Sequence, residues 1–235
     1  MRATRSSLVT AACALALVGC GSAEPTAQEP GPTVTTDAAP AATPTPTPTW
    51  TAPTDLPAEV MLPQNAWDAI GPDGSLEESE GVVDWFVEET CAAGSPADGI
   101  AMRTARQGSG EYETRFGAHQ VVVLADADAA VAEADRLAAA LTACPPSVAG
   151  SSTTYVVEPL AVGAQGIGVA TRYYGGEGPL DDAMGTYLAV TRRGNAVTLV
   201  AVHGGEGTVG SAREIVTANA QAAWELLCRY DSAGC

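Results

Sequence analysis

The most suggestive group of charged and aromatic side chains in this 235-residue sequence lies in ATRYYGGEGPLDD, residues 170–182. Arg172, Tyr173 and Tyr174 are expected at the end of a strand, and a glycine-rich loop over residues 175–178 follows them. Guanidinium and phenol groups combine stacking with hydrogen bonding, so arginine beside tyrosine is a frequent recognition set. The three residues are therefore our candidates for ligand contact. The plainer interpretation, which we favour on sequence alone, is that one tyrosine packs inward, the other covers the sheet edge and Arg172 is a solvated charge.

Motifs of known catalytic sites are scarce. The sequence has no GxSxG nucleophile elbow, no HExxH zinc motif, no Walker loop and no GxGxxG between a strand and a helix. Its two histidines are His119 and His203. The His-Gly-Gly at 203–205 is typical of an esterase oxyanion segment, but that interpretation needs a serine elbow, and a two-histidine metal site needs further ligands. We therefore expect no cofactor and no metal, and we rank an enzyme third among the functions considered.

The N-terminus has the layout of an export signal. Arg2 and Arg5 precede an apolar run over residues 8–18, which is too short for a bilayer span of about 20 residues. The run ends in LVGC, residues 17–20, which resembles a bacterial lipobox, whose cysteine sulfur receives a diacylglycerol and becomes the new N-terminus. We predict a lipoprotein signal peptide over residues 1–19 and lipid attachment at Cys20. The alternative is a plain secreted protein.

Composition divides the rest of the chain in two. Residues 20–55 are rich in proline and threonine and cannot bury enough apolar surface to offset their ordering entropy, so we predict a disordered linker. Residues 56–235 are enough for one folded domain. All 11 basic residues of the sequence are arginines. Removal of residues 1–19 takes away two of them and leaves 28 acidic against 9 basic residues, a net charge of −19. That charge argues against nucleic acid as a partner.

The cysteines that remain after processing predict crosslinks. Cys13 leaves with the signal peptide and Cys20 takes the lipid, so four cysteines stay in the folded domain: Cys91, Cys144, Cys228 and Cys235. An even number in an exported chain predicts two disulfides, for which three pairings exist. We prefer Cys91–Cys144, whose loop closure contributes about 4 kcal/mol in the chain-entropy model, with Cys228–Cys235 at about 2.4 kcal/mol.

Periodicity predicts the first elements of the domain. The acidic stretch over residues 73–89 reads as a solvated and partly helical face. The apolar run 121–124 predicts a buried strand. A helix follows, capped by Asp126 or Asp128 and stopped by two prolines at 145–146. Its apolar face is spaced by alternating fours and threes: Ala130, Ala134, Leu137, Leu141 and Cys144.

The second half of the domain reads as strands and a closing helix. Strands are expected near 153–159 and 166–174, and TYLAVTRRGNAVTLVAV predicts a hairpin around a Gly194-Asn195 turn. The last helix opens with a capping box from Ser211 to Glu214. It buries Val216, Ala220, Ala223, Leu227 and Tyr230. Strands joined by hairpins favour the α+β class, as a two-layer sandwich of a mostly antiparallel sheet with packed helices and two disulfides.

One block of the sequence resembles a known family. FVEETC at 86–91, then GSGEYETRFGAHQVVVLADADAAVAEADRLAAALTACP at 108–145, then strands, a hairpin and a closing helix are similar to the extracellular sensor domain of mycobacterial PknH-type serine/threonine kinases. That domain also occurs in stand-alone actinobacterial lipoproteins. The resemblance covers about residues 56–227 and implies a compact domain with a ligand-sensing cleft outside the membrane. It also implies the pairing of Cys91 with Cys144, whereas the family's second pair, within the sheet, is absent here.

These observations lead to two interpretations of function. The first is a lipid-anchored protein on the extracytoplasmic face of the cell membrane, whose domain binds or senses an unknown small molecule without catalysis. The second is a structural or interaction lipoprotein that docks on another envelope protein. A pocket with convergent polar groups favours the first, and a flat apolar patch favours the second. In either case we expect a monomer that contacts the membrane through its N-terminal lipid.

The anchor is tested by the substitution Cys20→Ala. Without the sulfur there is no attachment point for the diacyl group, and two acyl chains are what makes anchoring firm. The variant should be released from membranes or accumulate as an unprocessed precursor, as followed by fractionation and immunoblotting. A cleaved Cys20→Ala protein that still fractionates with membranes would show that the lipoprotein prediction is wrong.

Overall fold

The computed structural model describes residues 50–111, 114–145, 152–175 and 177–235. The predicted signal peptide, the predicted lipid site at Cys20 and most of the predicted linker lie outside the described residues. All described residues belong to one unit, Pro48–Cys235. Among them, no helix has the length and apolar character that a membrane span requires.

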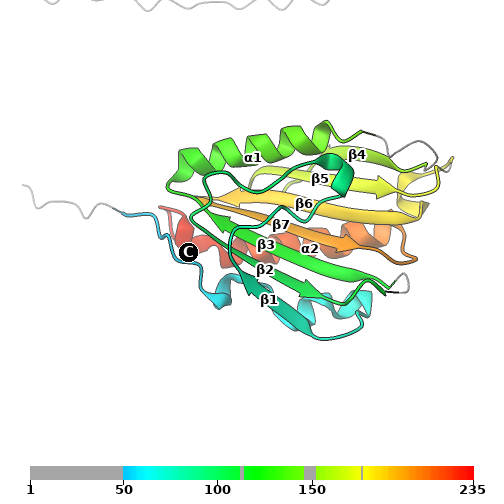
Figure 1. Ribbon diagram of the computed structural model, residues 1–235, viewed down its shortest axis with the longest axis horizontal. Coiled ribbons are helices and arrows are strands. Elements are labelled where there is room, and N and C mark those ends of the chain that lie inside the picture. The colour runs from blue at the N-terminus through cyan, green and yellow to red at the C-terminus, as the bar shows by residue number, and fades with distance from the viewer. Residues whose placement is uncertain (1–49, 112–113, 146–151, 176) are drawn as a thin grey trace, which may run out of the picture. The chain divides into compact units, whose positions relative to one another are not determined.

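A seven-stranded sheet in the order β1-β2-β3-β7-β6-β5-β4 forms the centre of this unit, and every neighbouring pair is antiparallel (Figure 1). The strands are β1, Leu76–Glu80; β2, Ala101–Gln107; β3, Phe116–Val123; β4, Thr154–Pro159; β5, Ala164–Arg172; β6, Gly185–Arg193; and β7, Ala196–His203. The α-helices are α1, Ala127–Thr142, and α2, Val209–Leu226. Short 3-10 helices span Ala58–Val60, Gln64–Ile70, Glu89–Cys91, Leu180–Asp182 and Cys228–Tyr230.

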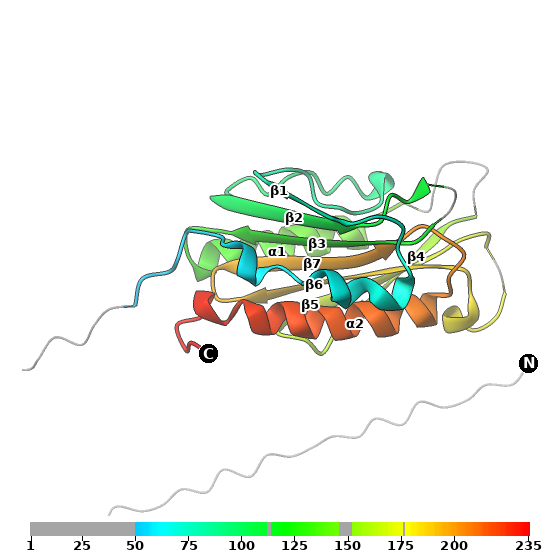
Figure 2. The same cartoon turned by 90° about the horizontal axis from the view of Figure 1, so that it is seen from below.

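The two helices cover opposite faces of the sheet. Successive residues of a strand point to opposite faces, and in β6 Leu188 packs in the cluster that contains the buried residues of α1. Its neighbour Tyr187 packs in the cluster that contains α2. In Figure 2 the strands accordingly run between the two helices. The α+β class with an antiparallel sheet and packed helices is confirmed. The layers number three rather than the expected two, because the central strands are apolar on both faces.

The β6–β7 turn lies where the sequence predicts it, and it holds the C-terminal segment. Gly194 has φ +55°, and a Cβ there would lie 1.7 Å from the carbonyl oxygen of Tyr230, so only glycine fits. The Asn195 backbone N–H donates to that same oxygen at 3.2 Å. The Asn195 side-chain amide donates to the carbonyl oxygens of Leu124, at 2.8 Å, and Pro53, at 2.9 Å.

Helix α1 begins as predicted, and helix α2 does not. The Asp126 carboxylate accepts the backbone N–H of Ala129 at 2.8 Å, which confirms one of the two predicted caps. Helix α2 begins at Val209, capped by the Thr208 hydroxyl, so the predicted capping box at Ser211 is wrong. The earlier start follows from a β-bridge between Met184 and Thr208, which fixes the chain just ahead of the helix.

The acidic stretch contains a strand where helical structure was expected. Residues 76–80, LEESE, form the edge strand β1 and pair with β2. Arg103 on β2 forms ion pairs with Glu78, at 3.5 Å, and with Glu80. Cross-strand pairs of opposite charge stabilise a sheet, and they offset the low strand propensity of glutamate.

Both preferred disulfides are present. Cys91 is bonded to Cys144, which joins the segment before β2 to the residues after α1. Cys228 is bonded to Cys235, which closes the C-terminal segment on itself. The predicted pairing of the four cysteines is therefore confirmed.

A buried histidine attaches the N-terminal segment to the sheet. His119 in β3 is fully buried; its Nδ1 accepts the Leu62 backbone N–H at 3.1 Å, and its Nε2 lies 3.0 Å from the Thr198 hydroxyl. Thr198 in turn donates to the Gln120 carbonyl oxygen, so His119 is neutral with its proton on Nε2. Burial lowers the pKa of His119 to about 3, and that of His203 to about 4.

These two histidines predict acid sensitivity. The folded state keeps them neutral, whereas the unfolded chain binds protons below its histidine pKa of about 6.5, so the free energy of unfolding falls as pH drops from about 6.5 toward 3–4. Between pH 7 and pH 5 each histidine should cost about 2 kcal/mol, measured by urea unfolding. His119→Gln, whose amide can still accept from Leu62, should show a smaller decline. An equal decline in both proteins would contradict this assignment.

Candidate ligand-binding cleft

After β1 and before β2, the chain forms a largely irregular segment that crosses the α1 side of the sheet (Figure 1). We call residues 81–94 of this segment the strap. Its two legs are joined by a hydrogen bond from the Trp85 backbone N–H to the Gly94 carbonyl oxygen, 3.0 Å long. Trp85 and Ala93, one from each leg, are buried in the same core cluster as α1. The strap is therefore part of the core and covers the area of the sheet that α1 leaves open.

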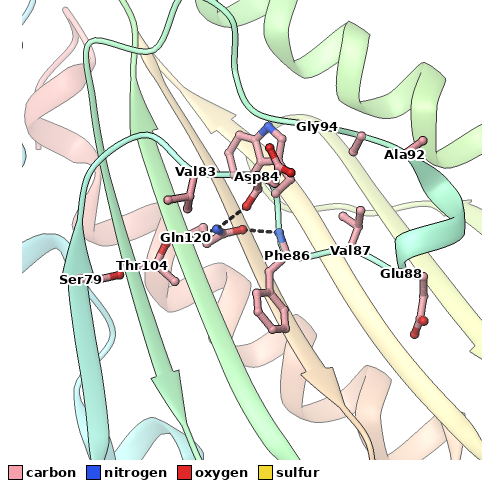
Figure 3. A pocket seen from close by; sticks show the side chains of 12 residues that line it. Ser79, Val83, Asp84, Phe86, Val87, Glu88, Ala92, Gly94, Thr104 and Gln120 are labelled. Atoms are coloured by element: carbon pink, nitrogen blue, oxygen red, sulfur yellow. Dashed lines mark hydrogen bonds between the residues drawn. The ribbon is translucent and has the colours of Figure 1, made fainter.

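Gln120 in β3 fixes the first leg of the strap to the sheet (Figure 3). Its side chain is fully buried, and its Oε1 accepts the Phe86 backbone N–H at 2.5 Å. Its Nε2 donates to the Asp84 carbonyl oxygen at 3.1 Å and to the Thr104 hydroxyl at 3.2 Å. The amide thus pairs with a donor and an acceptor two residues apart, as a neighbouring strand would.

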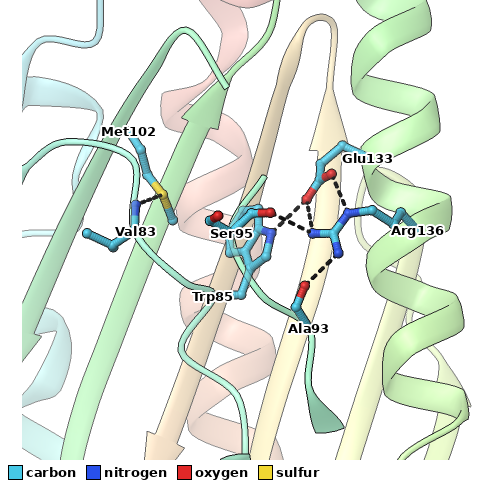
Figure 4. Close-up of polar contacts among 7 residues, drawn as sticks. All are labelled: Val83, Trp85, Ala93, Ser95, Met102, Glu133 and Arg136. Carbon is cyan, nitrogen blue, oxygen red and sulfur yellow. Dashed lines mark hydrogen bonds and ion pairs between the residues drawn. The ribbon is translucent and has the colours of Figure 1, made fainter. Parts of the chain in front are cut away.

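An ion pair between the buried Glu133 and the partly exposed Arg136 holds the second leg against α1 (Figure 4). Glu133 is 5% exposed and accepts from the Trp85 indole N–H at 2.7 Å and from Arg136 at 2.7 and 2.8 Å. Arg136 also donates to the carbonyl oxygens of Ala93, at 2.5 Å, and Ser95, at 3.5 Å. The hydrogen-bonded carboxylate raises the pKa of Arg136 above its usual value. Removal of Arg136 would leave the buried Glu133 carboxylate without its compensating charge.

The turn of the strap is held by two further elements. Cys91 is bonded to Cys144 beyond the end of α1. The Thr90 hydroxyl lies 2.9 Å from the hydroxyl of Tyr155 in β4. The strap thus has covalent and polar attachments on both legs and at its turn.

A cleft of about 530 Å³ lies between the strap and the strands beneath it (Figure 3). Its lining residues are Ser79, Val83, Asp84, Trp85, Phe86, Val87, Glu88, Ala92, Ala93, Gly94, Thr104 and Gln120. Small-molecule sites commonly measure about 300–1,000 Å³ and combine apolar walls with a few polar groups. Here the polar side chains include the hydroxyls of Ser79 and Thr104 and the carboxylates of Asp84 and Glu88. Within the part of the chain that the structure describes, no basic side chain lines the cleft.

Of the residues predicted to contact a ligand, Tyr173 lies beside Glu88 of the cleft wall, and its ring forms an edge-to-face pair with that of Tyr174, with centroids 6.3 Å apart. Burial raises the pKa of Tyr173 to about 12 and that of Glu88 above its ordinary value. Tyr174 is 73% exposed, and Arg172 donates to the Gly178 carbonyl oxygen at 2.9 Å. One tyrosine is thus turned inward and the other outward. Ligand contact by these three residues stays a prediction.

The two histidines do not form a joint site. His119 contacts Leu62 on the α2 side, whereas His203 packs between Phe86 of the strap and Phe116 on the α1 side, with both ring centroids at 5.2 Å. Among the described residues, no group of three or more histidine, cysteine, aspartate or glutamate side chains could hold a metal ion.

Sequence reasoning missed the residues that build the cleft. Gln120 stands between His119 and an apolar run, and a polar residue within a buried strand was the signal that something polar lies above it. Glu133 sits on the helix face next to Ala130, Ala134 and Leu137 and was hidden by the acidic character of the neighbouring sequence.

Comparisons with known proteins identify a similar solved structure. No family model matches the sequence, and no curated protein matches it. Among solved structures, the chain is similar to the extracellular domain of PknH from Mycobacterium tuberculosis, with a TM-score of 0.46 and 15% identity over 71% of this chain and 93% of that one. The resemblance stated from the sequence is therefore found among solved structures. At this TM-score the similarity carries no argument about fold or function, and the conclusions come from the residues of this chain.

The role of Gln120 is tested by Gln120→Leu. The substitution leaves the Phe86 N–H and the Asp84 carbonyl without partners beneath the strap, which should lower the free energy of unfolding by about 2 kcal/mol and speed amide exchange at Phe86. Gln221→Leu is the control, because Gln221 is exposed on α2 and its side chain bonds to Glu225. Equal stability of the two variants would rule out the role assigned to Gln120.

Proposed function

We propose that this chain is a lipoprotein, anchored through Cys20 on the extracytoplasmic face of the membrane, whose folded domain binds a small ligand in the strap cleft without catalysing a reaction. The observation that supports it best is the cleft itself, which combines apolar walls, hydroxyl and carboxyl groups along its lining, and a strap fixed by buried hydrogen bonds. A pre-formed site of this kind loses little conformational entropy when a ligand binds.

The cleft chemistry favours an uncharged or cationic ligand with an apolar body. Asp84 and Glu88 line it, and no arginine among the described residues does. The predicted mature chain carries a net charge of −19, so an anion would meet an unfavourable field on approach. Phe86, Val87 and Ala93 offer apolar contact, and the hydroxyls of Ser79 and Thr104 offer hydrogen bonds.

The proposed anchor and linker would determine how far the folded domain can lie from the membrane. A proline-rich segment over residues 20–55, at about 3.1 Å per residue, would allow the domain to stand on the order of 100 Å from the membrane. The domain would then reach ligands throughout the adjoining envelope.

Docking on another envelope protein is the second candidate function, and the edge strand β4 favours it. β4 pairs with β5 on one side, and its Val156 and Val157 are 39% and 37% exposed. An exposed strand edge can accept a strand from a partner.

The cleft is tested with Nile red, an uncharged apolar dye whose fluorescence rises in apolar surroundings. The parent protein should enhance its emission, and Val83→Trp should abolish the effect because the larger side chain fills the cleft at a position that is 45% exposed. Val82→Trp is the matched control, since Val82 is the neighbouring residue, is 41% exposed and does not line the cleft. Enhancement that survives in Val83→Trp, or is absent from the parent, would contradict the proposal.

A further inference from the structure

A second cavity, of about 590 Å³, lies where the β6–β7 turn meets the C-terminal segment. Its lining includes two arginines, three aromatic residues and one carboxylate: Arg192, Arg193, Trp50, Trp224, Tyr230 and Asp231. It differs in charge from the strap cleft, which has carboxylates in its wall and no arginine. In an acidic chain this cavity is a local concentration of positive charge.

Arg192 supplies that positive charge and has no direct ion-pair partner among the described residues, although the Gln165 side chain that accepts from it donates to Asp135 at 2.6 Å. The Nε of Arg192 donates to the Gln165 side-chain oxygen at 2.7 Å, and its Nη1 donates to the Gly194 carbonyl oxygen at 2.9 Å. Both acceptors are neutral, and within the described part of the chain Arg192 forms no ion pair. These two bonds orient the guanidinium, and its Nη2 donates to none of the described residues.

Arg193 has a different role in the same cavity. It donates to the carbonyl oxygens of Trp224, at 3.2 Å, and Gly234, at 3.1 Å, and its Nε lies 3.7 Å from the Asp231 carboxylate. Its guanidinium also lies 4.1 Å from the centroid of the Trp224 ring. Arg193 therefore holds the C-terminal segment and positions the Trp224 indole. It also pairs with Asp231, the one carboxylate among the described residues that line the cavity.

We propose that this cavity is a second binding site, and that it takes a small anion with a planar body, such as a phosphate ester or a carboxylate on an aromatic ring. The anion would accept from the free donors of Arg192, which suit the oxygens of a phosphate or carboxylate. The planar body would lie against the indole of Trp224, which lines the cavity. Its charge and its place in the fold separate it from the strap cleft.

The test uses phenyl phosphate and the purified full-length chain. Isothermal titration should detect binding, and the indole N–H resonance of Trp224 should shift as the probe is added. Arg192→Gln should weaken binding at least 10-fold, whereas Arg192→Lys, which retains the charge, should weaken it less. Arg229→Gln is the matched control, because it removes an equal charge that is paired with Asp55 and does not line the cavity. It should bind as the parent does.

Phenol separates the anionic group from the ring and should bind at least 10-fold more weakly than phenyl phosphate. Equal affinity for the two probes, or an unchanged affinity in Arg192→Gln, would overturn the proposal. A shift at the Trp85 indole without one at Trp224 would place the probe in the strap cleft, which would also overturn it. Thermal unfolding of each variant shows whether the fold is retained, and Arg192→Lys tests the charge if Arg192→Gln does not fold.

Discussion

The need to cover both faces of one wide sheet shapes this molecule. β7 is buried along its whole length, and β3 and β6 along most of theirs, so neither face can be left to water. A single helix of 16 or 18 residues does not cover seven strands. Irregular chain completes each face: the strap beside α1, and residues 56–71 beside α2. The strap cleft lies at the border of such an irregular cover, where packing is less regular than between a helix and a sheet.

The irregular segments that cover the sheet have backbone N–H and C=O groups that need hydrogen-bond partners. Buried polar side chains of the sheet and of α2 supply these partners. Gln120 serves the strap, His119 serves Leu62, and Asn219 of α2 donates to the Ala66 carbonyl oxygen at 3.0 Å. Each replaces the neighbouring strand or the water that an isolated backbone group would otherwise require. These buried polar residues therefore attach irregular segments of the chain to the sheet and to α2. The strap cleft lies beside one such segment, the strap.

Local signals made part of this fold predictable from sequence. The cap at Asp126 and the Gly194-Asn195 turn depend on nearby backbone geometry, and both were predicted correctly. The three layers, the strap and the start of α2 depend on distant contacts, such as the bridge from Met184 to Thr208. A fully buried strand has an apolar run without alternation, so its sequence does not say how many layers surround it. For the same reason the cleft, assembled from β1, the strap, β2 and β3, left little trace in any one stretch of sequence.

The Cys91–Cys144 bond ties the maturation of the cleft to its compartment. The two cysteines sit on segments that meet when the strap docks beside α1, and such bonds persist in oxidising surroundings and are rare where thiols are kept reduced. In the exported protein proposed above, oxidation of this pair would accompany export. A reduced copy inside the producing cell would lack the covalent link between the turn of the strap and the residues after α1.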